Sequence, residues 1–429
     1  MKRLALSVLY SACALLVSNA AHAEGLRLRE AIRLALTQNE RSLQAGQRVE
    51  AAEGSVDRAR SGFLPSLTLG ASATKQLEAD RPNQPTVTSS GTLTITQPLL
   101  NPGAFPSYWS AKHSRSAEKA GAQDTRRVLA FDTARAFLQV LTTEQLRKAA
   151  EQRLERARAN LANAEARADA GLSSVNDATR ARLDMTSALQ NVATGGANEK
   201  RAQLALGFLT GEAVTGPLDP PDTTTKNAEG FGERPRALAP SAASRRPDIL
   251  ALHERYLAAI DTAKDPRYRY APSINLSGQI RATPDENAVR WHNETISLSL
   301  SWTLYDGGVR AADVRSRGAQ AEIARLEEQF ARRGVERDVQ TAIAILDGAR
   351  GSYKAAQENV EVARKGVEEA NILYRQGLGR AIELVDANAK LFEGEVSLAT
   401  AKLQMEQAYL EVRYALGLDP LDDMGTPVR

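Results

Sequence analysis

The chain has 429 residues, of which 42% are hydrophobic and 25% are charged, and its formal net charge at pH 7 is +3. This near balance of charge gives no electrostatic case for nucleic-acid binding. One cysteine and four histidines leave little material for disulfides or for a metal cluster. Composition alone therefore does not indicate a function, and we infer it from the order of the predicted elements along the chain.

The first 23 residues have the three parts of a secretory signal peptide. Met1–Arg3 is a basic start, Leu4–Val17 is an apolar stretch, and Ala21–Ala23 is an A-x-A cleavage site. The apolar stretch is shorter than the roughly 20 residues of a membrane-spanning helix, so we expect residues 1–23 to be removed on export. Lipid attachment at Cys13 stays an open alternative, although the residues before it match a lipidation site poorly.

The rest of the chain repeats one plan twice, with a period of roughly 200 residues that is typical of a duplication. Four pairs of similar segments follow one another in the same order: residues 63–70 and 270–277, 92–96 and 296–300, 171–177 and 377–383, and 205–207 and 415–417. This pattern predicts a first repeat at 24–211, a linker or equatorial segment at 212–245, a second repeat at 246–417 and a C-terminal tail at 418–429.

Each repeat contains two segments in which apolar residues alternate with Ser, Thr, Asn or Gln. This period of two predicts strands with one apolar and one polar face, at about 64–76, 87–97, 272–282 and 294–305. Their lengths suit tilted strands that cross a bilayer. A soluble sandwich would show the same alternation, but aromatic residues near the segment ends favour a membrane: Phe63, Tyr268, Tyr270, Trp302 and Tyr305.

Long stretches of helix-forming sequence follow each pair of strands. Residues 309–374 contain no proline, and about 65 residues suffice for a helix of roughly 100 Å. Apolar residues recur every seven positions, as in Ala342, Ala349, Ala356, Ala363 and Ala370. Such a repeat predicts helices packed side by side with a supercoil. The periodicity alone leaves open an ordinary coiled-coil dimer or a spectrin-like bundle, but each long helix is tethered to a candidate membrane strand.

The four predicted strands also predict an oligomer. Four strands cannot close a barrel, and an open sheet edge in lipid leaves backbone groups unpaired at a cost of several kcal/mol each. The smallest transmembrane barrels have about 8 strands. Three chains with four strands each would supply twelve, so we expect a homotrimer in contact with outer-membrane lipid.

At this point the chain resembles the TolC family of outer-membrane efflux proteins. The resemblance covers nearly the whole mature chain. It rests on the duplicated plan and on Pro65 and Pro272, where strands begin. It also rests on Arg246-Pro247-Asp248 at the start of the second repeat and on Gly-Leu pairs at two predicted helical hairpin turns, 170–173 and 376–379. In one departure, Asn39-Glu40 stands where the family usually has Asn-Pro, and we expect this to affect only a local helix start.

The resemblance implies an α+β membrane protein, in which a trimeric 12-stranded transmembrane β-barrel continues into a periplasmic α-helical barrel. Its implied function is that of a passive exit duct in the outer membrane, with a long periplasmic portion, which serves a tripartite efflux pump or a type I secretion system. The implied partners are a periplasmic adaptor (membrane fusion) protein and an inner-membrane pump or ABC transporter.

The family also implies roles for residues near the two hairpin turns. Gly171, Leu172, Gly377 and Leu378 would form periplasmic tips that dock the adaptor. Glycine additionally lets the chain reverse at the end of each helix, which any such hairpin requires.

Glu383 and Asp386 lie three residues apart, on one helix face, where the family has two aspartates that ring the periplasmic constriction. Six carboxylates in a trimer would favour cations, although a Glu-x-x-Asp pair alone is usually a solvated helix face. Asp177 and Tyr374 match positions of the latch that holds the entrance shut, and Arg380 is a further candidate for this latch. Some members have an arginine at the position of Gly379, one residue earlier, so we expect a weaker latch or a different pair.

Two rival interpretations remain. An enzyme is disfavoured because the sequence has no phosphate-binding loop, no His-Glu-x-x-His and no nucleophile elbow. We therefore expect no catalytic residues, no cofactor and no metal site. An exported coiled-coil structural or adaptor protein without a pore explains the seven-residue repeat and the export signal, but it does not explain the strands or the duplication.

Overall fold

A computed structural model describes residues 25–75, 87–214, 216–221, 224–231, 239–283 and 292–421. The predicted signal peptide, with Cys13, lies outside the described residues, as does most of the predicted C-terminal tail. The chain forms two compact units. The sheet unit consists of Ala45–Ala122 and Pro247–Arg332, and the hairpin unit consists of Met1–Gln44, Gln123–Arg246 and Arg333–Arg429. Each unit therefore draws on both halves of the sequence.

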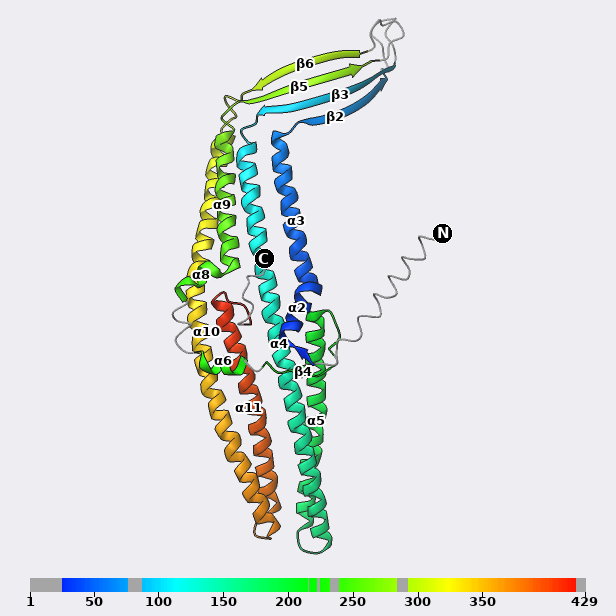
Figure 1. Cartoon of the computed structure of the whole chain (residues 1–429), viewed down its shortest axis with the longest axis vertical. Helices are drawn as coiled ribbons and strands as arrows, with labels where there is room; N and C mark the ends of the chain where they lie inside the picture. Colours follow the sequence, from blue (N-terminus) through cyan, green and yellow to red (C-terminus); the bar gives the residue numbers. More distant parts are fainter. Residues whose placement is uncertain are drawn as a thin grey trace. The chain divides into compact units, whose positions relative to one another are not determined.

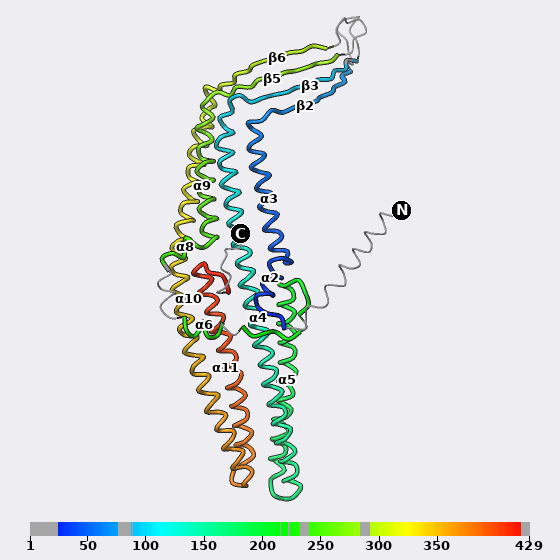
Figure 2. Tube along the Cα trace, in the orientation of Figure 1, coloured from blue at the N-terminus to red at the C-terminus, as the bar shows by residue number. Residues whose placement is uncertain are grey.

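The sheet unit contains one antiparallel sheet in the order β2-β3-β5-β6 (Figures 1 and 2). Its strands are β2 (Ser66–Lys75), β3 (Val87–Leu100), β5 (Ser273–Ala282) and β6 (His292–Ser301). The helix α3 (Glu40–Arg60) and the short turn η1 (Ser61–Phe63) precede β2, and α9 (Pro247–Tyr268) precedes β5. The two strand pairs of the duplicated plan thus join through β3 and β5 into one sheet.

Two long helical hairpins dominate the hairpin unit. One is formed by α4 (Ala104–Asp169) and α5 (Val175–Thr210), and the other by α10 (Val309–Arg375) and α11 (Ala381–Ala415). Figure 1 shows both hairpin turns at the same end of this unit. The first residues of α4 and of α10 belong to the sheet unit, so that these two helices have residues in both units, whereas α5 and α11 lie within the hairpin unit.

Shorter elements surround the hairpins within the same unit. They are β1 (Leu26–Arg27), α2 (Leu28–Gln38), β4 (Leu218–Asp219), α6 (Thr224–Gly230), η2 (Ala239–Ser241) and α8 (Ala242–Arg245). β1 pairs with β4 in parallel. The predicted equatorial segment at 212–245 thus contains short elements where it is described, and its other residues lie outside the described part.

The seven-residue repeat of the sequence corresponds to a buried stripe on α10. Ala342, Leu346, Ala356 and Val360 are at most 6% exposed. A separate apolar core joins α2, α4, α5 and α11 and includes the fully buried Ile32, Phe131, Phe137, Leu206 and Leu410. None of the helices in the described part of the chain is both long and apolar enough to span a membrane.

Asn39 separates α2 from α3. Its side-chain oxygen accepts a hydrogen bond from the backbone N–H of Arg41 (3.0 Å), and its side-chain nitrogen donates to the carbonyl of Leu209 (3.0 Å). An asparagine in this position caps the start of a helix. The departure from Asn-Pro therefore coincides with a local helix start.

Arg246, the first residue of Arg-Pro-Asp, is a structural residue of the hairpin unit. It is 8% exposed, its Nη1 lies 3.5 Å from Oδ2 of Asp338 on α10, and its guanidinium lies 6.0 Å from the ring centroid of Tyr414 on α11. Arg127 of α4 stacks on the same ring at 4.3 Å and donates to the Tyr414 carbonyl at 2.7 Å. Two guanidinium groups thus contact the ring of Tyr414, and these contacts hold the end of α11 against α4 and α10.

Glu406 ties α6 to α11. It is 6% exposed, and its Oε1 accepts a hydrogen bond of 2.5 Å from the hydroxyl of Thr225. Burial raises the pKa of Glu406, and the hydrogen bond from Thr225 and the charge of Lys402 offset only part of this effect. From α10, Arg350 donates to the carbonyls of Ala228 and Phe231, both at 2.7 Å.

Candidate functional site

The register of the sheet separates apolar from polar side chains. Residues directly opposite each other in neighbouring strands lie on the same face, and pairs such as Leu67–Ile95, Leu93–Ile280 and Leu276–Leu298 join apolar residues. One face thus carries Leu67, Leu69, Ala71, Ala73, Leu93, Ile95, Ile274, Leu276, Ile280, Ile296, Leu298 and Leu300. The same face also carries a few polar residues, namely Lys75, Ser89, Gln97, His292 and Glu294.

The opposite face is polar across all four strands. It carries Ser66, Thr68, Ser72, Ser90, Thr92, Thr94, Thr96, Asn275, Ser277, Gln279, Arg281, Thr295, Ser297 and Ser299. Hydrogen bonds join its side chains across strands: Ser72 Oγ lies 3.1 Å from Ser90 Oγ, and Ser277 Oγ lies 2.7 Å from Ser297 Oγ. A sheet with one mainly apolar and one mainly polar face suits a wall between lipid and water.

The apolar face is open in the single chain. Ile296 is 83% exposed, and Leu298 and Leu300 are 67% and 63% exposed. Exposed apolar patches of this kind mark surfaces that contact a membrane or another protein. At the helix end of the sheet, the Trp302 indole nitrogen donates to the Tyr270 carbonyl at 2.9 Å. Phe63 packs edge-on against Phe105, with ring centroids 5.0 Å apart. Tryptophan and tyrosine, whose rings are amphipathic, are typical of membrane–water interfaces.

Both hairpin turns have the same backbone geometry. Gly171 and Gly377 have φ of 73° and 77°, a left-handed conformation that glycine adopts without steric cost. The N–H of Leu172 donates to the carbonyl of Arg167, and the N–H of Leu378 donates to the carbonyl of Leu373. These are the bonds of a Schellman motif. Leu172 and Leu378 are 77% and 76% exposed, so each turn presents an apolar side chain at its surface.

Glu383 and Asp386 are exposed on the first turns of α11. Oε2 of Glu383 accepts a hydrogen bond from the backbone N–H of Arg380 (3.2 Å), so this carboxylate caps the helix. Asp386 pairs with Lys390 one turn later, with 3.6 Å between Oδ2 and Nζ, and both side chains are well exposed. The two carboxylates therefore share an exposed region, and each has a local contact within its own helix.

The three residues expected in a latch lie in different environments. Tyr374 is 7% exposed and packs against Ala381 and Leu384. Asp177 is partly exposed in the first turn of α5, and Arg380 is exposed at the start of α11. Within the described part of the chain, no hydrogen bond or ion pair joins Arg380 to Asp177.

Instead, Arg167 links the two hairpins. Its guanidinium lies 4.6 Å from the ring centroid of Tyr374, and its Nη2 donates to the carbonyl of Arg375 at 3.3 Å. Sequence reasoning missed this residue because one arginine among many near the end of α4 carries no local signal. It also missed the buried ion pair of Arg153 on α4 with Asp184 on α5 (2.9 Å), which joins the two helices of the first hairpin.

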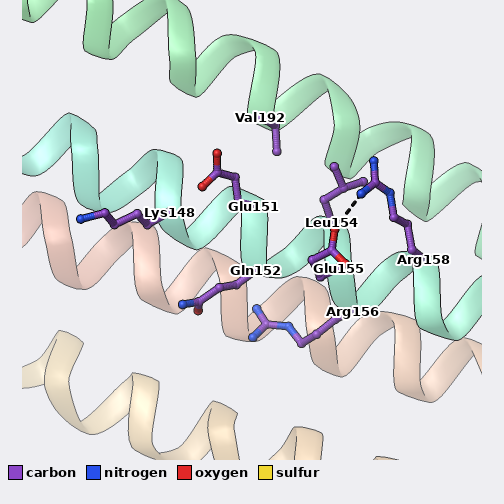
Figure 3. Close-up of a pocket in the computed structure, with 8 residues that line it drawn as sticks. All are labelled: Lys148, Glu151, Gln152, Leu154, Glu155, Arg156, Arg158 and Val192. Carbon is purple, nitrogen blue, oxygen red and sulfur yellow. Dashed lines mark hydrogen bonds and ion pairs between the residues drawn. The ribbon is translucent and has the colours of Figure 1, made fainter.

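A surface groove of about 770 Å³ runs along α4 of the hairpin unit (Figure 3). It is lined by Lys148, Glu151, Gln152, Leu154, Glu155, Arg156, Arg158 and Val192. Arg158 pairs with Glu155 at 2.6 Å, and Arg156 lies 3.6 Å from Glu395 of α11. Charges of both signs line it without a cluster of metal ligands, and the described residues contain no group of three or more His, Cys, Asp or Glu that could hold a metal ion.

Comparison with known proteins identifies the family of this chain. The outer membrane efflux protein family matches residues 31–212 and 238–418. Outer membrane protein TolC of Salmonella enteritidis is 25% identical over 390 residues, which cover 86% of this chain and 77% of TolC.

Two solved structures share the fold. The open state of the MtrE outer membrane channel of Neisseria gonorrhoeae superposes with a TM-score of 0.79 at 19% identity, over 93% of this chain and 91% of MtrE. A structure of CusC, described in terms of transmembrane channel formation, has a TM-score of 0.78 at 18% identity and covers 91% and 92% of the two chains.

The family and these structural neighbours are channel proteins rather than enzymes. The resemblance to the TolC family that the duplicated strands and helices indicated is therefore confirmed, and so is the outer membrane as the location. The chain belongs to the outer membrane efflux protein family and is an outer-membrane efflux channel protein.

Proposed function

We propose that three copies of the chain close their sheets into one twelve-stranded transmembrane barrel. The edge strands of the described sheet are β2 and β6. All neighbours are antiparallel, and each chain contributes an even number of strands. β6 of one copy can therefore pair antiparallel with β2 of the next, and head-to-tail contacts of this kind close into a ring. Closure pairs every backbone edge, which a bilayer requires.

The division of the sheet into one mainly apolar and one mainly polar face is the observation that carries this proposal. A closed barrel places the apolar face of residues such as Leu69, Ile95 and Leu298 against lipid, and the Ser/Thr face around a water-filled lumen. A non-pore coiled-coil protein has no need of such a sheet. Strands of 10 residues, as in β2, β5 and β6, match the bilayer when tilted.

In the same proposal, the helical hairpins of three chains form a periplasmic tunnel. Energy would enter at an inner-membrane pump or ABC transporter, so the duct itself performs no catalysis. The exposed Leu172 and Leu378 at the turns would contact a periplasmic adaptor, in a tripartite efflux pump or a type I secretion system. The groove along α4 offers an additional surface for such a contact within the hairpin unit.

Glu383 and Asp386 would form the acidic constriction of the closed entrance. Both are exposed in the single chain, and a trimer would bring six carboxylates around one axis, which favours cations over anions. Arg167 and Tyr374 would contribute to the closed state by joining the two hairpins of one chain. We therefore assign the contact between the two hairpins of one chain to Arg167 and Tyr374, and not to Arg380 and Asp177.

Single-channel recording in planar bilayers tests the proposal. Purified protein should give cation-selective conductance steps, and Glu383→Ala/Asp386→Ala should lose most of the selectivity. Glu368→Ala/Glu369→Ala, which removes two exposed carboxylates from α10, is the matched control and should keep it. Steps with unchanged selectivity in the first variant would place the constriction elsewhere. Protein that inserts and never conducts would contradict the channel itself.

A further inference from the structure

A second charged site lies where the sheet meets the helices of the sheet unit. A pocket of about 590 Å³ is lined by backbone and side chains from the ends of α3 and α9 and from the start of α4. Its volume falls within the range of small-molecule sites, about 300–1,000 Å³. Its charged lining residues are Arg58 and Arg269, and Ser61, Asn101, Ser107, Ser273 and Thr303 add hydrogen-bonding groups. Among the residues that the structure describes, no carboxylate lines it.

The lining of the pocket includes a residue of the polar face of the sheet. Ser273 belongs to its lining and pairs with Ser301 in the register. Because side chains alternate along a strand, Ser273 shares its face with Asn275, Ser277 and Gln279. The inference therefore rests on the proposed barrel, because only a closed barrel turns this polar side into a lumen.

Around the pocket, guanidinium groups outnumber the carboxylates that pair with them. Asp265, which is 4% exposed, accepts a hydrogen bond of 3.1 Å from Nε of Arg269 and one of 2.5 Å from Nη1 of Arg317. One carboxylate thus serves two guanidinium groups. Arg58 is exposed, and no hydrogen bond or ion pair joins its guanidinium to a carboxylate in the described part of the chain.

The walls of the pocket are fixed. Arg310, which is 7% exposed, donates to the carbonyls of Arg269 (3.1 Å) and Thr303 (2.8 Å) and pairs with Asp306 (2.7 Å). On the other side, the amide of Asn101 donates to the carbonyl of Gly62 at 3.2 Å. Asp265 holds the guanidinium of Arg269, so that binding of an oxyanion would restrict mainly the exposed side chain of Arg58.

We propose that this pocket, with Arg58 and Arg269 as its charged groups, binds the phosphate or carboxylate group of an anionic molecule in the lumen. The planar guanidinium group can donate two parallel hydrogen bonds to two oxygens of either anion. The channel would then carry two charged levels of opposite sign, because the proposed constriction at Glu383 and Asp386 is acidic. Anionic cargo would meet its attractive site only in the barrel.

Pyrophosphate is a suitable probe, and Arg58→Ala is the decisive variant, because Arg58 is exposed and its loss leaves no buried charge without a partner. In planar bilayers, pyrophosphate should reduce the conductance of the wild type, and the half-blocking concentration should rise at least tenfold in Arg58→Ala. Arg58→Lys should recover part of the block. Arg60→Ala is the matched control: Arg60 is also exposed at the end of α3 but does not line the pocket, so block should stay within twofold of wild type.

Equal block of the wild type and Arg58→Ala would overturn the inference while the channel stands. If neither protein conducts, the barrel proposal fails, and calorimetric titration of detergent-solubilised protein with pyrophosphate still decides on the pocket: a tenfold weaker affinity of Arg58→Ala supports it, and equal affinities refute it.

Phosphorus analysis separates the two sources of the anion. Bound lipid that the wild type retains and Arg58→Ala loses would show that the pocket binds a lipid phosphate and would overturn a luminal ligand, whereas equal lipid content with reversible block identifies a soluble anion.

Discussion

The guanidinium of Arg167, at the end of α4, lies 4.6 Å from the ring centroid of Tyr374, at the end of α10. The two residues come from different halves of the duplicated sequence, and each precedes the left-handed glycine of its own hairpin turn. Their contact therefore joins the two hairpins directly, at the level where we propose that the channel closes.

Arg167→Ala should favour the open entrance. A cation–π contact at a partly exposed site contributes about 0.5–1 kcal/mol, which corresponds to a shift of roughly two- to fivefold in the ratio of open to closed channels for each chain. We expect longer or larger conductance steps in planar bilayers. Arg158→Ala removes an arginine that pairs with Glu155 on the same helix, and it serves as the control. Identical open times in both variants would show that Arg167 has no part in closure.

The two turn glycines should tolerate alanine poorly. In Gly377→Ala, the side chain would meet no neighbour, but the φ of 77° is strained for any residue with a Cβ. We expect a loss of about 1 kcal/mol in stability. Gly366→Ala, in the interior of α10 with open space around it, should instead stabilise the helix by about 0.5–1 kcal/mol. Thermal unfolding in detergent should move the two midpoints in opposite directions, and a common shift would contradict the turn geometry.

Glu406 should make stability depend on pH. Burial raises its pKa in the folded chain. The protonated form is therefore favoured by folding, and its contribution to stability is fully present below the ordinary glutamate pKa and is lost as the pH rises through the folded value. A tenfold difference in proton affinity between the folded and unfolded chains corresponds to about 1.4 kcal/mol.

Glu406→Gln should match the wild type near pH 4 and become increasingly more stable toward pH 7. The check is the difference between the two unfolding midpoints across this range. Glu358→Gln, on the exposed surface of α10, is the control and should show no such trend. A difference that stays constant with pH would mean that Glu406 is as well solvated in the folded chain as in the unfolded one.

The two faces of the sheet predict opposite tolerance to charge. Leu298 lies on the apolar face opposite Leu276, and Ser299 lies on the polar face opposite Asn275. An arginine that faces lipid near the middle of a bilayer costs about 2–4 kcal/mol, whereas a lumen-facing one is accepted by water. Leu298→Arg should therefore reduce the yield of heat-resistant oligomer in the outer membrane, and Ser299→Arg should preserve it. Equal assembly of both variants would argue against a lipid-facing apolar side.

Local structure followed from sequence period and turn chemistry. The alternation at Ile296, Leu298 and Leu300 specifies one apolar strand face, because successive side chains point to opposite sides. The seven-residue spacing of Ala342, Ala349 and Ala356 specifies one helix face in the same way. Gly171 and Gly377 end helices because glycine alone adopts their backbone conformation freely. These are properties of a few neighbouring residues, and a sequence contains them in full.

Long-range partners were decided only by the tertiary structure. The sequence indicated Asp177, Tyr374 and Arg380 as latch candidates but gave no signal for Arg167, which packing places on Tyr374, or for the cap that the carboxylate of Glu383 forms on α11. The arginine pocket likewise draws Arg58 and Arg269 from separate repeats. Period and spacing fix which way a side chain points along its own element. The distant residue that a side chain contacts depends on the register and packing of whole helices and strands. Many arginines have the same local sequence pattern, and packing brings only some of them to a partner.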